Sequence, residues 1–210
     1  MNSKRNKFIV FLACGILLMV LPFLLQPFGN SWVRIIDMVL LYIMLALGLN
    51  IVVGYAGLLD LGYVAFFAVG AYVFGLLASP HLLSQFANLA SAFPDGVHYN
   101  IWVVLAIAAF IAGVAGMLLG APTLKLRGDY LAIVTLGFGE IVRIFLLNLD
   151  RPINITNGPK GLMRIDDVNL FGVDFGRPLD LGFVTIESVS LYYYLFLLMV
   201  IMTIFICYRI

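Results

Sequence analysis

The chain has 210 residues, of which 63% are hydrophobic and 11% are charged, and its formal net charge at pH 7 is +1. A soluble globular domain is about 45–50% apolar and about 25% charged, so this composition excludes a soluble enzyme and a disordered chain. The near-zero net charge excludes a basic face for nucleic acid. The solvent that suits this much apolar surface is a lipid bilayer. Because one spanning helix needs about 20 residues, the chain has room for about six to eight spans.

The N-terminal segment predicts an uncleaved first span. Lys4, Arg5 and Lys7 precede an apolar run over residues 8–25. This order of charge and hydropathy resembles a signal peptide, but the run is long for one and no small-residue cleavage site follows it. The run is therefore predicted to remain as a membrane helix.

Five further apolar stretches follow in chain order. They are predicted as spans over residues 33–53, 61–79, 101–121, 130–149 and 191–208. The stretch between the second and third spans is rich in glycine and too short for a soluble loop, so it predicts an interrupted or re-entrant segment. The predicted fold class is therefore all-α: a polytopic helical membrane protein of about six transmembrane helices in one domain, residues 1–210. Residues 150–190 are predicted as an extracytoplasmic segment.

Positive charges in short loops predict the orientation of the chain. The N-terminus is basic, and the connector after the fourth span carries Lys125 and Arg127, whereas the loop at 80–100 has no Lys or Arg. Six alternating spans then place the N-terminus and this connector in the cytoplasm and the loop outside. The connector ends with Gly128 and Asp129, and Asp129 is predicted to cap the fifth helix after a turn at Gly128.

Three ionisable residues are candidates for a translocation path or for buried ions, because a charge inside a membrane needs a partner or water. Asp60 lies in the glycine-rich stretch 54–62. It either caps the third helix or belongs to a broken helix at a translocation path. Glu140 lies near mid-bilayer, and Arg143 shares its helix face three residues on, so the two are predicted to pair. This pair either serves transport or only anchors helices to each other.

Small residues at four-residue spacing mark two helix faces that suit close packing. They are Ala108, Ala112, Gly116 and Gly120 in the fourth span, and Ala71 and Gly75 in the third. Each face is expected to accept another backbone, either within this chain or at a seam with another membrane subunit.

The other polar residues predict structure rather than chemistry. Arg34 and Asp37 have i,i+3 spacing near the outer end of the second span, which predicts a structural pair. His81 and His98 lie in the outer loop with no other ligand at metal-binding spacing, so no metal site is predicted. The sequence has no P-loop and no hydrolase motif, which predicts that the chain neither binds ATP through such a loop nor acts as an enzyme.

Two stretches resemble a known family. Residues 54–72 read GYAGLLDLGYVAFFAVGAY, and residues 124–162 include LRGDYLAIVTLGFGEIVR and NITNGPKGL. They are similar to the signatures of the branched-chain amino-acid ABC permease family. The chain as a whole resembles the M-type permease subunit of the high-affinity importers in that family.

The resemblance implies a multi-pass permease subunit in the bacterial inner membrane, with a cytoplasmic N-terminus, that moves leucine, isoleucine or valine inward by alternating access. The implied partners are a second related permease subunit, two cytoplasmic ATP-binding subunits and a periplasmic branched-chain amino-acid-binding protein. ATP would be bound by the partners, so no cofactor is implied for this chain. The connector at 125–129 would lie on the ATPase side, and the segments at 80–100 and 150–190 would meet the binding protein.

Members of the family continue past the sixth span, so the chain is expected to be truncated there. Two alternatives remain open at this point. One is an ion-coupled secondary transporter that uses Asp60, or Glu140 with Arg143. The other is a truncated membrane remnant that inserts into the bilayer and transports nothing.

Overall fold

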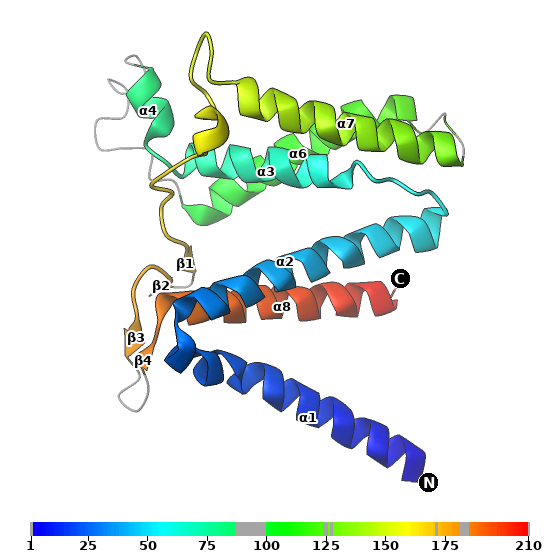
Figure 1. Ribbon diagram of the computed structural model, residues 1–210, viewed down its shortest axis with the longest axis vertical. Helices are drawn as coiled ribbons and strands as arrows, with labels where there is room; N and C mark the ends of the chain where they lie inside the picture. Colours follow the sequence, from blue (N-terminus) through cyan, green and yellow to red (C-terminus); the bar gives the residue numbers. More distant parts are fainter. Residues whose placement is uncertain are drawn as a thin grey trace. The chain divides into compact units, whose positions relative to one another are not determined.

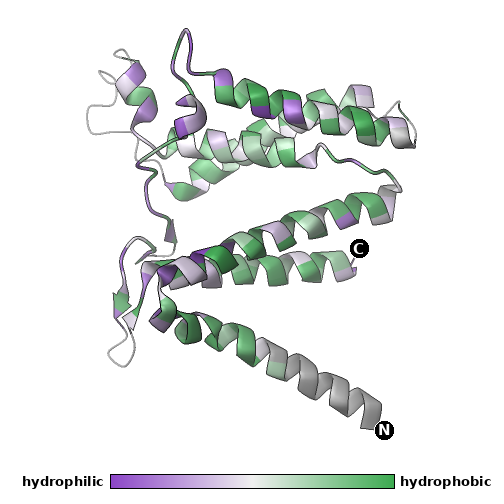
Figure 2. Cartoon of the chain, in the orientation of Figure 1, coloured by the Kyte–Doolittle hydropathy of each residue, from purple (hydrophilic) through white to green (hydrophobic). Residues whose placement is uncertain are grey.

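In the computed structural model the chain is a set of long apolar helices, with two small pairs of strands before the last one (Figure 1). The structure describes residues 2–86, 100–123, 126, 128–170, 172–180 and 185–209. These residues group into two compact units, one of residues 1–48 with 174–210 and one of residues 49–173. Most of the described helical residues are hydrophobic, and hydrophilic ones are more frequent in the connecting segments (Figure 2).

The elements follow the apolar runs of the sequence. The long helices are α1 (Asn2–Leu25), α2 (Asn30–Ile51), α3 (Tyr63–Leu77), α6 (Ile101–Thr123), α7 (Asp129–Asn148) and α8 (Ser188–Arg209). The short helices are the 3-10 turns η1 (Gln26–Phe28) and η3 (Gly158–Lys160), the π-helix η2 (Val52–Ala56) and α4 (His81–Gln85). Strand β1 (Asn169–Leu170) pairs with β2 (Val173–Asp174), and β3 (Leu179–Asp180) pairs antiparallel with β4 (Thr185–Ile186).

Among the described residues, four helical stretches are long and apolar enough to cross a membrane. They are Asn30–Tyr55, Ile101–Thr123, Tyr130–Asn148 and Ser188–Arg209, and two shorter apolar helices are Gly15–Phe28 and Tyr63–Leu77. The predicted fold class, an all-α polytopic membrane protein, is confirmed. The third span is shorter than expected, since α3 has 15 residues and the residues just before Tyr63 are not helical. That six spans cross the bilayer stays a prediction.

The first unit is built on contacts between α2 and α8. Its buried cluster takes Val33 and Leu40 from α2, and Tyr193, Leu197 and Val200 from α8. These positions recur at spacings of three, four or seven residues, so each set lies along one face of its helix.

The predicted pair between Arg34 and Asp37 in this unit is wrong. The ion pairs among the described residues are Glu140–Arg143 and Asp174–Arg177. Arg34 is exposed, whereas Asp37 has a buried Oδ1 without a hydrogen-bond partner. The two side chains therefore have different surroundings, although their spacing on the helix would allow a contact.

A proline in α1 explains how α8 attaches to it. Pro22 lies inside α1 and is fully buried. It has no N–H, so the carbonyl of Leu18, four residues earlier, loses its helical donor. The Tyr193 hydroxyl donates to that carbonyl at 2.7 Å, and the Tyr194 hydroxyl donates to the next one, Met19 O, at 2.8 Å. This satisfies backbone groups that lipid cannot.

The second unit holds α3, α6 and α7, with α3 packed most extensively against α6 and also in contact with α7. The chain after α7 turns back and is bonded to the ends of two helices. The Thr156 hydroxyl, fully buried, donates to Leu146 O at 2.6 Å, and Asp166 N donates to Ala78 O at 2.7 Å. The segment at 150–166 is therefore tied both to α7 and to the end of α3.

Candidate functional site

A groove of about 800 Å³ runs between α3 and α7 in the second unit. Its lining residues come from these two helices and from the turn just before α3. They are Leu61, Val64, Ala65, Ala68 and Tyr72 on one side, and Ile133, Leu136, Gly137, Gly139, Glu140, Val142, Arg143, Leu146 and Leu147 on the other. Almost all of this lining is apolar or small. The exceptions are the two charged side chains and the hydroxyl of Tyr72.

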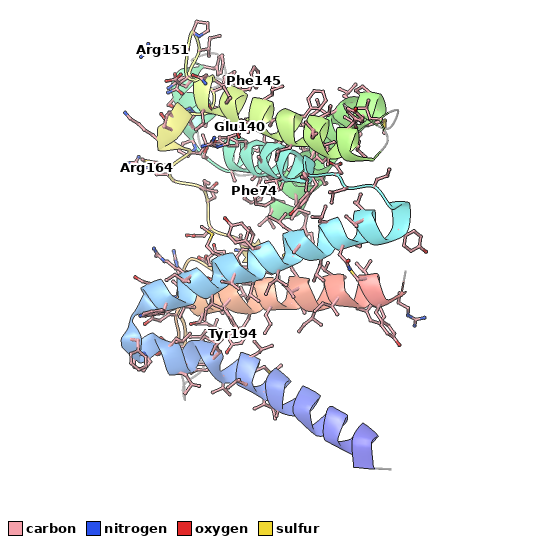
Figure 3. All side chains as sticks on the ribbon, turned by 45° about the vertical axis from the view of Figure 1, so that its right-hand side comes forward. Phe74, Glu140, Phe145, Arg151, Arg164 and Tyr194 are labelled. Carbon is pink, nitrogen blue, oxygen red and sulfur yellow. The ribbon has the colours of Figure 1, made fainter. Side chains whose placement is uncertain are left out.

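The two charged residues of the groove form an ion pair on one face of α7, and Figure 3 labels Glu140 on that helix. Arg143 Nη1 donates to Glu140 Oε1 at 2.7 Å, as the i,i+3 spacing allows. The side chains remain 66% and 55% exposed for Arg143 and Glu140, respectively. An ion pair that is open on one side within an apolar span needs water, a ligand or another subunit beside it, because hydrocarbon solvates neither charge.

The stretch between α2 and α3 is the interruption that the glycines predict. The π-helix η2 is capped at its C-terminal end by Gly57, which has φ +63° in the left-handed region that glycine adopts most readily. Residues 57–62 are not helical. The Asp60 carboxylate accepts the N–H of Gly62 at 2.8 Å, which closes a turn ahead of α3. The N-cap position itself is Gly62, with no side-chain cap. Asp60 therefore stabilises the turn that precedes α3 and is not the N-cap residue of the helix.

This turn is in direct contact with α7. The Leu61 N–H donates to the Thr135 hydroxyl at 3.1 Å. At Gly62 a Cβ atom would lie 2.5 Å from the carbonyl oxygen of Thr135, a distance that no real Cβ contact tolerates. Glycine at position 62 is therefore what lets the start of α3 meet the backbone of α7.

Asp60 lies apart from the Glu140–Arg143 groove. It lines a separate cavity of about 10 Å³ together with Gly120, Thr123 and Thr135. A volume of this order holds at most about one water molecule. Of the three predicted ionisable candidates, the structure brings Glu140 and Arg143 together and places Asp60 at a different cavity.

Ala112 and Gly116 of α6 face α3, whereas a Cβ at Gly120 would meet no neighbouring atom within 4 Å. A Cβ at Gly70 would lie 3.5 Å from Ala112 Cβ, and a Cβ at Gly116 would lie 3.7 Å from the Phe66 ring. Ala108 on the same face is buried. These contacts occur inside the chain, in line with one of the two expected uses of this face. A seam with another subunit stays a prediction.

The small residues of α3 have different surroundings. Ala71 is exposed. A Cβ at Gly75 would lie 2.9 Å from Leu162 Cδ1 and 3.5 Å from Ile165 Cδ1. Gly75 thus makes room for the segment at 150–166 rather than for another helix.

The predicted cytoplasmic connector is described only in part. Lys125 and Arg127 lie outside the described residues. Helix α7 begins at Asp129, and its N-cap position is Gly128, with φ +60°. The cap therefore falls one residue earlier than predicted. A φ in this range favours glycine over residues with a side chain.

The described histidine makes a structural contact. His81 Nε2 lies 3.2 Å from the carbonyl oxygen of Asn154, which joins α4 to the segment after α7. His98 lies outside the described residues. Within the described ranges no group of three or more His, Cys, Asp or Glu side chains is placed to hold a metal ion.

Sequence reasoning did not single out Tyr72 or Thr135. A signal for Tyr72 exists in the spacing of Val64, Ala68 and Tyr72, which recur every four residues and so share the groove face of α3. Thr135 has no comparable signal. Its contact with Leu61 joins residues 74 positions apart.

The sequence of the chain is similar to those of known transport proteins. Residues 31–210 match the family described as "Branched-chain amino acid transport system / permease component". Two relatives carry the name "High-affinity branched-chain amino acid transport system permease protein LivM". The protein of Escherichia coli (strain K12) is 45% identical over 174 residues, 83% of this chain and 35% of the relative. That of Salmonella typhimurium (strain LT2) is 43% identical over 176 residues, 84% of this chain and 36% of the relative. The chain thus spans about a third of the length of these relatives, and no solved structure matches it significantly.

Proposed function

The chain belongs to the family of branched-chain amino-acid transport permease components, and from this premise we propose that it is the membrane-spanning permease subunit of an importer for leucine, isoleucine and valine. The observation that carries the proposal is the family match over residues 31–210, together with the sequence identity to the two relatives. The family resemblance of residues 54–72 and 124–162 is thereby confirmed. The chain is a transport component and not an enzyme.

In this proposal the energy comes from partner proteins. Two cytoplasmic ATP-binding subunits hydrolyse ATP, a second related permease subunit completes the pathway, and a periplasmic protein delivers the amino acid. The chain lies in the bacterial inner membrane with its N-terminus in the cytoplasm. The connector at 125–129 then lies on the ATPase side, and the segment at 150–190 faces the delivering protein. Transport proceeds by alternating access, in which the open side of the pathway changes as the ATP-binding subunits close and separate.

The groove between α3 and α7 is our candidate for this chain's share of the pathway. It combines a long apolar wall with one ion pair, Glu140 and Arg143. Both ends of the groove are held by hydrogen bonds. The turn at Leu61 is bonded to Thr135 on α7, and the segment at 150–166 is bonded to α7 and to the residue after α3. Helices held at both ends move as one body, so access to the groove changes when the neighbouring permease subunit moves.

A cell-based uptake assay tests the proposal. The chain and its partner proteins are produced in a bacterium without its own branched-chain amino-acid uptake, and accumulation of labelled L-leucine is measured. We expect uptake that requires the binding protein and active ATP-binding subunits, and that persists with an uncoupler while ATP is maintained. Uptake without partners that the uncoupler abolishes identifies the ion-coupled secondary transporter. Stable insertion with no leucine-dependent uptake identifies the non-transporting remnant.

A further inference from the structure

The ion pair in the α3–α7 groove is largely exposed, which a pair that only anchors helices to each other does not need to be. An i,i+3 pair on an exposed helix face contributes little to stability, yet two charges stand here within an otherwise apolar span. Both side chains keep more than half of their surface exposed, at 66% and 55%. The pair satisfies itself internally and still presents a positive and a negative group side by side to the groove.

Resting on the proposed function, we propose that this pair is the recognition site for the charged head of a free amino acid. The Arg143 guanidinium receives the α-carboxylate, and the Glu140 carboxylate receives the α-ammonium. The aliphatic side chain of the substrate lies against the α3 wall of the groove. The occupant is thus a zwitterion with an apolar side chain, in the low-dielectric part of the pathway.

Charge balance favours this occupant. The pair is neutral as a whole, and so is an amino acid near neutral pH, so binding brings no net charge into the membrane. When the zwitterion enters, one ion pair at 2.7 Å is exchanged for two, and each charge of the protein keeps a partner. A ligand with only one of the two charges leaves either Arg143 or Glu140 unpaired in a region where that is costly.

The walls of the groove favour an aliphatic side chain. Across from the pair, α3 contributes Val64 and Ala68, and Leu61 precedes the helix. On α7 the groove passes over Gly137, where a Cβ atom would meet no neighbouring atom within 4 Å, so space remains next to Glu140. When the aliphatic side chain of the substrate binds here, its apolar surface is transferred from water to apolar surroundings, which is favourable. A charged or amide side chain finds no second charged partner among the residues that line this wall.

Cysteine protection tests the proposal without ATP hydrolysis or uptake. The chain is produced with its partner subunits, and Ala68→Cys on the groove wall is labelled with N-ethylmaleimide in isolated membranes. Ala109→Cys, at an exposed position of α6 outside the groove lining, is the matched control. The native cysteines, Cys14 and Cys207, set the background in the unsubstituted chain. The probes are L-leucine, 4-methylpentanoate, which lacks the ammonium, and 3-methylbutylamine, which lacks the carboxylate.

We expect L-leucine at ten times its half-maximal concentration to slow labelling of Ala68→Cys by about tenfold, as simple site occupancy requires, and to leave labelling of Ala109→Cys unchanged. Each one-charge analogue is expected to need at least about ten times the concentration for the same protection, which corresponds to about 1.4 kcal/mol. Adding Arg143→Gln is expected to remove the preference for leucine over the amine. Where Ala68→Cys fails to insert, Val64→Cys reports on the same wall.

A charge exchange separates recognition from anchoring. The double variant Glu140→Arg with Arg143→Glu keeps an i,i+3 pair and the net charge, so the helix and the thermal stability are expected to persist. A zwitterion must turn over to match the exchanged charges, which takes its aliphatic side chain off the α3 wall. Protection of Ala68→Cys by L-leucine is therefore expected to be lost.

Four results overturn the proposal: no protection by leucine, equal protection of both cysteines, analogues as effective as leucine, or full protection in the charge-exchanged variant. Labelling that the second permease subunit blocks regardless of leucine identifies the groove as a helix interface and also overturns it. Failure of the proposed function is seen separately, as the absence of partner-dependent uptake by the unmodified chain. Normal uptake with no protection refutes the recognition site alone.

Discussion

The substitution Gly62→Ala tests the contact between the turn before α3 and the backbone of α7. The added Cβ would lie 2.5 Å from the Thr135 carbonyl oxygen and 3.1 Å from its carbonyl carbon. Ordinary contact begins near 3.4 Å, so the turn and α7 must separate by about 0.9 Å. The atom in the way belongs to the backbone and has no rotamer by which to move aside.

The cost has two parts. Overpacking of this kind costs about 1–3 kcal/mol. The separation also stretches the bond from Leu61 N to Thr135 Oγ1, which is 3.1 Å long, and a hydrogen bond of this type contributes about 0.5–1.5 kcal/mol. We therefore expect Gly62→Ala to destabilise the chain by about 2–4 kcal/mol, which for a chain of this size lowers the melting temperature by on the order of 5–15 °C.

Thermal unfolding in detergent, followed by circular dichroism, measures this loss. Gly54→Ala is the matched control, because no atom lies within 4 Å of its Cβ position. Shortening the Thr135 side chain is not expected to rescue Gly62→Ala, since the 2.5 Å contact is with the carbonyl oxygen. If Gly62→Ala unfolds at the same temperature as Gly54→Ala, the proposed contact between the turn and α7 is refuted.

Two further predictions concern hydrogen bonds and charge. Tyr193→Phe removes the donor to Leu18 O and leaves that carbonyl without a hydrogen-bond donor, so it is expected to cost about 1–3 kcal/mol. Tyr208→Phe, at a position 89% exposed in the same helix, is expected to unfold like the unmodified chain. Equal melting temperatures for both variants would contradict the explanation. Glu140→Gln deprives Arg143 of its partner and is expected to destabilise the chain, whereas Glu140→Gln with Arg143→Gln recovers part of the loss. A thermal double-mutant cycle should show a coupling of about 0.2–1 kcal/mol, as for other exposed ion pairs, and additive effects would show that the two charges are independent.

The sequence alone was sufficient for the fold class and the family. Each long apolar run became a helix because a chain in lipid satisfies its backbone within the segment, and only the boundaries moved, as where α3 begins at Tyr63 after a turn. The spacing of Glu140 and Arg143 determined that they share a face of α7, because three residues make nearly one helical turn. The stretches at 54–72 and 124–162 pointed to the family that residues 31–210 match.

The tertiary structure decided which faces meet. Lipid tails are as apolar as leucine, so hydropathy alone does not say which side of a membrane helix packs and which stays exposed. The contact of Leu61 with Thr135 spans 74 positions and that of Tyr193 with Leu18 spans 175, and no local pattern encodes either. The same spacing rule that predicted the pair on α7 failed for Arg34 and Asp37, because one side chain is exposed and one oxygen of the other is buried. Spacing places two residues on one face of a helix, but only the packing of the neighbouring helices determines what that face contacts.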